Sequence, residues 1–196
     1  IDSLARPGWV EGHEVRITSS IGIAVWPHDG PDVESLLRNA DSAMYHAKEI
    51  GRANFQYYRR ELNAHALERL ELAANLSRAI QEDCLRVHYQ PKLELVTRRI
   101  TGCEALVRWS DPYRGAVSPT HFVPLAEASG LIFGLGESVL RQACLCAQTW
   151  HAQGHPQLKL AVNLSPAQIK DERLVDTIDG VLRETGFDPS LLEFEI

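Results

Sequence analysis

The sequence has no long apolar run and no excess of basic charge, and each shortage excludes a class of protein. No apolar stretch reaches the roughly 18 residues that a membrane-spanning helix needs, and no signal peptide is visible, so we expect no membrane segment. The formal net charge of −6 argues against a broad basic surface that binds the phosphate backbone of a nucleic acid. We therefore expect no DNA or RNA polymer as partner. A nucleotide ligand would need a local positive site.

Cysteine is also scarce, and its four positions lack the paired C-x-x-C spacing of a zinc site. Cys144 and Cys146 lie two residues apart in a helical pattern, so they cannot share one face of a helix. We interpret all four as reduced, small apolar side chains, which predicts a cytoplasmic protein. The chain begins at Ile1 rather than Met, so we expect a piece of a longer protein.

The N-terminal part alternates between strand and helix patterns. A β-branched run at 15–25 predicts a strand, and apolar residues at helical spacing predict a helix over 33–50 with Gly51 at its C-terminal cap. A short strand is expected at 53–58. A long amphipathic helix over 60–83 is expected to join two domains, which we place at residues 1–59 and 60–196.

Strands separated by helices continue through the second domain and predict βα units in a parallel sheet or barrel, an α/β fold. The expected strands lie at 85–95, 99–109, 158–165 and 191–196, and the expected helices at 119–128, 134–153 and 166–185.

Polar side chains interrupt these strands on one face. Side chains alternate along a strand, so Glu104 and Arg108 share a face, and Asn163 and Glu195 lie opposite their apolar neighbours. Two carboxylates and an amide oxygen near strand ends form a hard-oxygen set that suits magnesium or manganese. Arg108 could hold a phosphate oxygen in fork geometry. The alternative is a buried Glu104–Arg108 pair beside a satisfied amide, since an unpaired buried carboxylate is unfavourable.

Five ordered motifs, "YQPKLEL", "GCEALVRW", "FVPLAEASGLI", "AVNLSPAQ" and "LLEFEI", together resemble the first half of EAL domains over roughly residues 67–196. The resemblance implies part of a TIM-like barrel phosphodiesterase of bacterial second-messenger signalling. Such an enzyme hydrolyses cyclic di-GMP to the linear dinucleotide pGpG with Mg²⁺ or Mn²⁺.

The same resemblance implies roles for individual residues. It assigns Glu104, Asn163 and Glu195 to metal binding and Arg108 to a substrate phosphate, and Gln90 would face the substrate. The alternative for Gln90 is a strand-end amide bonded to backbone.

The segments "ITSSIGIAVWPHDG" and "LLRNADSAMYHAKEIGRANF" resemble the C-terminal portion of a GGDEF domain, the diguanylate cyclase fold. This implies that Lys48 and Arg52, four residues apart near a helix end, contact the triphosphate of GTP. Their alternative role is simply to complement the helix dipole. The GGDEF signature itself is not in the sequence, so we expect this chain to have no cyclase activity.

The resemblance leaves two functions open. The first is a piece, inactive by itself, of a GGDEF–EAL phosphodiesterase in which the later half of the barrel completes the two-metal site. The second is a degenerate GGDEF–EAL protein that binds cyclic di-GMP without hydrolysis. A dimeric parent protein is compatible with both.

Overall fold

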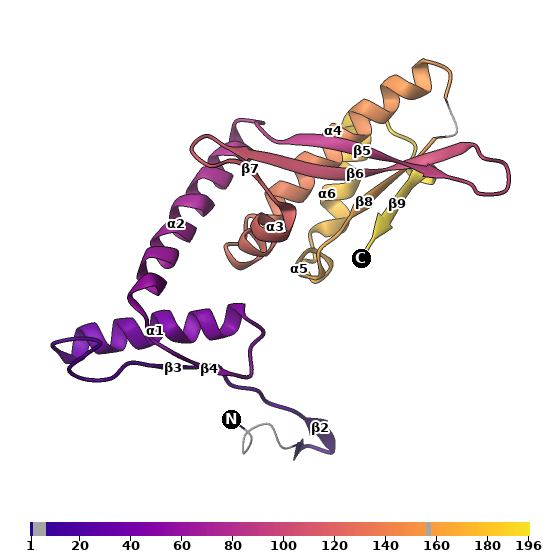
Figure 1. Cartoon of the computed structure of the whole chain (residues 1–196). Coiled ribbons are helices and arrows are strands. Elements are labelled where there is room, and N and C mark those ends of the chain that lie inside the picture. The colour runs from indigo at the N-terminus through magenta and orange to yellow at the C-terminus, as the bar shows by residue number, and fades with distance from the viewer. Residues whose placement is uncertain (2–6, 156–157) are drawn as a thin grey trace. The chain divides into compact units, whose positions relative to one another are not determined.

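The structure is a computed structural model that describes residue 1, residues 7–155 and residues 158–196. It divides into two compact units, Ile1–Leu70 and Glu71–Ile196. Helix α2 (Arg60–Gln81) is the helix predicted over 60–83 and runs from the first unit into the second (Figure 1).

The first unit is built from short strands and one long helix. Its elements are β1 (Gly8–Val10), β2 (His13–Val15), β3 (Ile21–Ile23), α1 (Val33–Glu49) and β4 (Phe55–Tyr57). Strands β1 and β2 form an antiparallel hairpin that the sequence analysis did not predict, and β3 pairs with β4 in parallel. The strand predicted at 15–25 is therefore too long, because β4 offers β3 a ladder over only Ile21–Ile23.

Helix α1 begins and ends where the sequence chemistry favours it. Asp32 accepts a hydrogen bond from the Ser35 amide at 2.7 Å, and the Ser35 hydroxyl accepts one from the Asp32 amide at 3.3 Å, which closes a capping box. At the other end Gly51 has φ of 121°, a conformation that L side chains rarely adopt. Gly22 of β3 packs directly on the helix backbone: a Cβ added there would lie 1.8 Å from the Ala40 carbonyl oxygen.

The second unit contains one sheet of five strands: β5 (Arg86–Leu93), β6 (Ile100–Asp111), β7 (Gly115–Val117), β8 (Lys159–Asn163) and β9 (Leu192–Glu195). The spatial order is β5–β6–β8–β9, and β7 pairs with β6. Strands β6, β8 and β9 are parallel, as predicted, and helices connect them.

Strand β5 corrects the prediction of a wholly parallel arrangement, because it pairs with β6 in antiparallel. Only residues 94–99 connect the two strands, and a crossover between parallel strands needs a dozen or more residues. The short strand β7, which also pairs in antiparallel with β6, was not predicted.

The helices of the second unit are α3 (Pro119–Ala128), α4 (Ile132–Ala152), α5 (Pro166–Ile169) and α6 (Leu174–Thr185), followed by the short 3₁₀ helix η1 (Pro189–Leu191). Gly186 ends α6 in the left-handed conformation, as predicted. The single helix predicted over 166–185 is wrong. Asp171 breaks it by accepting hydrogen bonds from the backbone and the guanidinium of Arg173, an alternative to helical pairing. Of the helices in the described part of the chain, none is both long and apolar enough to cross a membrane.

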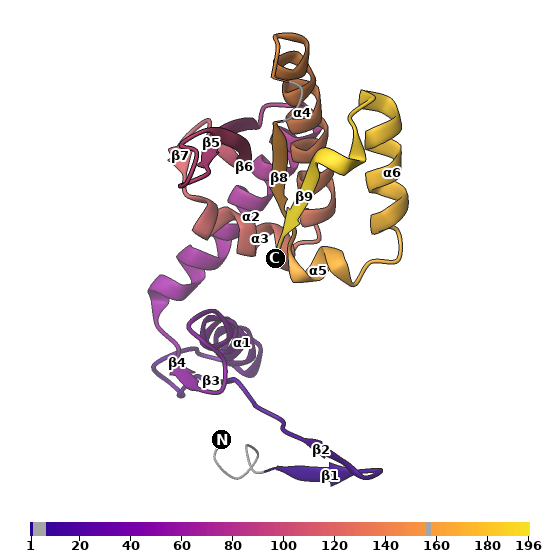
Figure 2. The ribbon, with the colours of Figure 1, turned by 90° about the vertical axis from the view of Figure 1, so that its right-hand side faces the viewer.

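The two faces of the sheet differ in chemistry. Helices α4 and α6 cover one face, as the two views of the ribbon show (Figures 1 and 2). The buried side chains of this apolar face and its helices include Cys103, Ala105, Leu160 and Val162 from the strands, and Val139, Ala143, Cys144 and Val181 from the helices. The opposite face, here called the polar face, carries the alternate residues of each strand.

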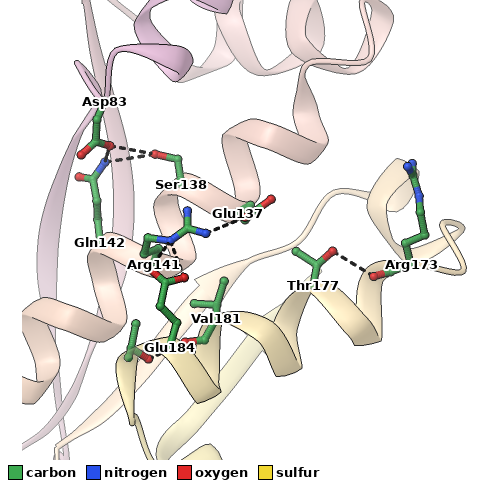
Figure 3. Close-up of polar contacts among 10 residues, drawn as sticks. Asp83, Glu137, Ser138, Arg141, Gln142, Arg173, Thr177, Val181 and Glu184 are labelled. Carbon is green, nitrogen blue, oxygen red and sulfur yellow. Dashed lines mark hydrogen bonds and ion pairs between the residues drawn. The ribbon is translucent and has the colours of Figure 1, made fainter.

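Polar contacts hold α4 against its neighbours (Figure 3). Arg141 of α4 bonds to Glu137 at 2.6 Å and to both carboxylate oxygens of Glu184 on α6, at 3.0 and 3.1 Å. At the end of α2, Asp83 accepts a hydrogen bond from Gln142 at 2.9 Å. The partly exposed Arg141–Glu184 ion pair contributes little energy, but it joins a defined turn of α4 to α6.

A buried carboxylate at the end of β6 links the sheet to α2. Asp111 accepts hydrogen bonds from the backbone amides of Tyr113 and Arg114, at 2.9 and 2.8 Å, and from the Asn75 side chain at 2.8 Å. Burial opposes ionisation of Asp111 and is the largest single influence, but these hydrogen bonds together outweigh it and hold its pKa below the ordinary value. Leu76 and Ala79 of the same helix are buried beside Trp109 and Phe122.

The close approach of Gly22 to α1 predicts that Gly22→Ala destabilises the first unit by about 3 kcal/mol, because only backbone movement can relieve the clash. Hydrogen exchange of the α1 amides measures this. Gly8→Ala is the matched control, because its added Cβ would meet nothing closer than 3.9 Å. Unchanged exchange in Gly22→Ala would contradict the packing of β3 on α1.

The lowered pKa of Asp111 predicts a pH dependence with a definite sign. The ionised carboxylate stabilises the fold above its unfolded pKa of about 3.9, and this contribution is lost as pH falls through the lower folded pKa. Asp111→Asn should therefore be less stable than the parent sequence at pH 7, by about 1–2 kcal/mol, and the difference should shrink below about pH 4. Urea denaturation at several pH values measures it, with Asp179→Asn on the exposed side of α6 as control. A difference that grows on acidification would contradict the assignment.

Candidate functional site

The predicted site residues of the second unit lie on the polar face of the sheet. Gln90 stands opposite Glu104 in the β5–β6 ladder, Glu104 lies beside Ala161 of β8, and Asn163 lies beside Glu195 of β9. Four neighbouring strands therefore present polar atoms to one region, although Gln90 and Glu195 are more than a hundred residues apart.

Glu104 and Asn163 touch directly. The Asn163 Nδ2 amide donates a hydrogen bond to Glu104 Oε1 at 2.7 Å, across 59 residues of sequence. This contact uses the nitrogen of the Asn163 side chain, so its carbonyl oxygen Oδ1 still offers lone pairs to a cation. Asn163 and Glu195 are the last residues of β8 and β9, as predicted for strand-end ligands.

Glu104 itself is not near the end of its strand, because β6 continues to Asp111. The parallel ladder with β8 stops at Ala105, although β6 continues to pair with β5 as far as Arg108 and then with β7. Measured along the parallel part of the sheet, Glu104 still lies at the carboxyl edge. Its side chain is half-buried rather than fully enclosed.

Glu195 lies in a network of four charged side chains. Lys92 of β5 donates a hydrogen bond from Nζ to Glu195 Oε1 and lies 3.8 Å from Glu193 Oε2. Lys159 of β8 donates to Glu193 Oε1 at 2.7 Å. The hydrogen bond to Glu195, aided by the charges of Glu195, Glu193 and Glu104 and opposed by burial, raises the pKa of Lys92. The hydrogen bond from Lys159 lowers the pKa of Glu193. Both shifts favour the charged forms of Lys92 and Glu193.

Arg108 does not pair with Glu104. Its Nη1 donates to the Val107 carbonyl oxygen at 2.9 Å, and the structure, which describes both side chains, forms no ion pair between Arg108 and Glu104. The alternative of a buried Glu–Arg pair is therefore wrong. Arg108 and Asn163 line one cleft of about 350 Å³, whose other walls come mainly from α3, α4 and the start of α5. Gln90 is exposed on the polar face.

The donor set of the polar face fits a divalent cation. Within the described ranges, no group of three or more His, Cys, Asp or Glu side chains is arranged to hold a metal ion. The predicted set differs in kind, because it combines two carboxylates with an amide oxygen, and hard cations accept both. The Lys92 ammonium between Glu193 and Glu195 shows that these carboxylates already take up a positive charge.

The two basic residues predicted to contact GTP lie at the end of α1. Lys48 is exposed in the last turn of the helix. Arg52 lies beyond the helix with φ of 57°, so the two residues do not belong to one helix.

The sequence analysis missed Lys92 and Lys159. Strand parity could have found Lys92, because it lies two residues after Gln90 and so projects from the same face of β5. Its partner could not have been found in this way, because the contact with Glu195 depends on how the sheet brings β5 towards β9.

Comparisons with known proteins identify the family of both parts of the chain. The sequence model of the EAL domain matches residues 73–196, and that of the GGDEF domain of diguanylate cyclases matches residues 1–54. The chain is 43% identical over its whole length to an uncharacterised signalling protein of Caulobacter vibrioides, of which it covers 24%. It is 41% identical over its whole length to the bifunctional diguanylate cyclase/cyclic di-GMP phosphodiesterase MucR of Pseudomonas aeruginosa, of which it covers 29%. The chain thus spans about a quarter of the length of these relatives.

Solved structures give the same assignment. The MucR phosphodiesterase in complex with cyclic di-GMP superimposes on 64% of this chain and 51% of its own, with a TM-score of 0.61 and 39% identity. The FimX EAL domain superimposes on 62% of this chain and 49% of its own, with a TM-score of 0.55 and 28% identity. The chain belongs to the EAL domain family, and the end of a GGDEF domain precedes its partial EAL domain.

Proposed function

We propose that the protein containing this chain hydrolyses cyclic di-GMP to pGpG, using Mg²⁺ or Mn²⁺ held on the polar face. The names of three relatives support the substrate: MucR, the cyclic di-GMP phosphodiesterase NbdA of Pseudomonas aeruginosa at 36% identity, and the cyclic di-GMP phosphodiesterase PdeR of Escherichia coli at 38%. Because the chain spans only about a quarter of each, the activity is proposed for the longer protein, and the chain alone is expected to be inactive.

One observation carries the proposal: the 2.7 Å contact between Glu104 and Asn163, with Glu195 next to Asn163 in the β8–β9 ladder. A purely structural role for Glu104 would pair it with Arg108, the basic residue on the same strand face. Instead Glu104 bonds to Asn163 of the neighbouring strand, and Arg108 lines the same cleft as Asn163.

Each residue has a distinct role in this proposal. Glu104, Glu195 and the Oδ1 oxygen of Asn163 would hold the cation. A bound divalent ion supplies an activated water and neutralises phosphate charge. Arg108 would hold a phosphate oxygen through its guanidinium fork, and Gln90 would orient the substrate from β5.

For the rest of the chain we propose a division at residues 59 and 60, which assigns all of α2 to the EAL domain. The burial of Leu76 and Ala79 in the core of the second unit supports this for the later turns of the helix. Lys48 and Arg52 remain proposed contacts for GTP phosphates. The four free cysteines support the predicted cytoplasmic location, and a dimeric parent protein remains compatible with the fold.

A receptor that binds cyclic di-GMP without hydrolysis is the second candidate. The ion pair between Lys92 and Glu195 favours it, because it engages one proposed ligand in another contact. The two functions differ in a single-turnover assay with Mn²⁺: an enzyme converts bound cyclic di-GMP to pGpG, whereas a receptor releases it unchanged.

We expect Glu104→Gln to reduce hydrolysis in the longer protein by roughly 100-fold or more, because the variant keeps the shape of the side chain but removes an anionic ligand. The thermal midpoint should change little, since Gln can still accept the hydrogen bond from Asn163. Turnover and thermal denaturation measure the two effects, with the exposed Glu172→Gln as control. Near-normal turnover in a folded Glu104→Gln protein would refute the metal role.

Arg108→Lys should act on the substrate rather than on the metal. Lys keeps the charge but loses the fork, so we expect KM for cyclic di-GMP to rise about tenfold while Mn²⁺ affinity stays within about twofold. Steady-state kinetics and Mn²⁺ titration separate the two quantities, and Arg183→Lys on the exposed side of α6 is the control. A loss of Mn²⁺ affinity without a change in KM would contradict the phosphate role.

A further inference from the structure

We propose that Lys92 is a built-in competitor for the metal site, an ammonium tethered to β5 that occupies Glu195 until a divalent cation displaces it. This inference rests on the proposed metal role of Glu104, Asn163 and Glu195. It adds Lys92 as a residue that determines the affinity of the site for the metal ion.

The contact is notable for the distance that it spans. Lys92 is on β5 and Glu195 on β9, and two further strands lie between them in the sheet. Three strand spacings in a flat sheet would separate β5 from β9 by about 14 Å. The direct hydrogen bond therefore requires a sheet that curves about its polar face, and a Lys92 side chain that crosses this face over β6 and β8.

The Lys92 ammonium consequently lies among carboxylates of the polar face, one of which, Glu195, is a proposed metal ligand. It touches Glu195, lies 3.8 Å from Glu193, and is attracted by the charge of Glu104. Without a cation, these three carboxylates on one face would repel one another. Lys92 supplies one positive charge to this group, and Lys159 supplies another to Glu193.

The direction of the effect follows from charge. A metal ion that takes the Glu195 oxygens must break the bond to Lys92. The freed ammonium cannot leave, because it is covalently attached to β5, so it stays close to a divalent ion and repels it. Both effects weaken metal binding, and both disappear when the amine is removed.

Lys159 provides a matched comparison. It carries the same charge on the same face but bonds only to Glu193, at 2.7 Å, and its side chain is 53% exposed against 35% for Lys92. If Lys92 acts by occupying Glu195, rather than by adding positive charge to the face, then Lys159 should have much less influence.

The test is a titration with Mn²⁺ alone, monitored by electron paramagnetic resonance, on the longer protein. The unsubstituted sequence is compared with Lys92→Met, Lys92→Arg and Lys159→Met. We expect Lys92→Met to bind Mn²⁺ about three- to tenfold more tightly than the parent sequence. Lys159→Met should change the affinity by less than about twofold, and Lys92→Arg, which keeps the charge, should stay near the parent value. The gain in Lys92→Met should shrink as ionic strength rises.

Three results would overturn the inference. Unchanged or weaker Mn²⁺ binding in Lys92→Met would show that Lys92 does not compete with the metal ion for Glu195. Equal gains in affinity in Lys92→Met and Lys159→Met would show that only the total positive charge of the face matters. In both cases Mn²⁺ binding that Glu104→Gln abolishes would leave the proposed metal site standing. If neither the parent nor Lys92→Met bound Mn²⁺, the metal site and the inference would fail together.

Discussion

The alternation of side chains along β6, β8 and β9 is the constraint on which the rest of the second unit depends. These strands are parallel and in register, so every residue that faces α4 and α6 has a neighbour in the chain that faces away. Burying Cys103, Ala105 and Val162 against the helices therefore forces Glu104 and Asn163 onto the polar face. A slip of one residue would bury the carboxylate and expose the core, so the packing that stabilises the fold also aligns the site.

The same periodicity explains which features of the fold and the site could be predicted from the sequence and which could not. The three parallel strands, the helices α1 to α4 and the shared face of Glu104 and Arg108 follow from local patterns, which the sequence displays directly. The antiparallel pairing of β5 with β6 was missed, although the connection at 94–99 is too short for a crossover between parallel strands. The break between α5 and α6 was missed because this segment can form either helical hydrogen bonds or the Asp171–Arg173 contact, and the local pattern suits both. The pairing of Lys92 with Glu195 lies beyond local patterns, because it depends on sheet curvature.

Charge balance on the polar face connects the structural and functional interpretations. Glu104 is satisfied by an amide, Glu193 by Lys159 and Glu195 by Lys92, so the carboxylates can share one face before any cation arrives. None of these contacts is fully buried, which keeps the exchange of an ammonium for a metal ion accessible. Asp111 differs, because it is buried and fixed by three hydrogen bonds to α2 and the β6–β7 turn. It stabilises the frame around the site rather than the site itself.

The central claim is that Glu104, Asn163 and Glu195 share one cation, and anomalous diffraction tests it most directly. Crystals of the EAL domain that includes residues 60–196 would be soaked in Mn²⁺, and data would be collected at the manganese edge. The account predicts an anomalous peak within coordination distance of Glu104, Asn163 Oδ1 and Glu195, with the Lys92 ammonium moved away from Glu195. Crystals with no peak on the polar face, or with Mn²⁺ bound elsewhere while Lys92 still holds Glu195, would contradict it.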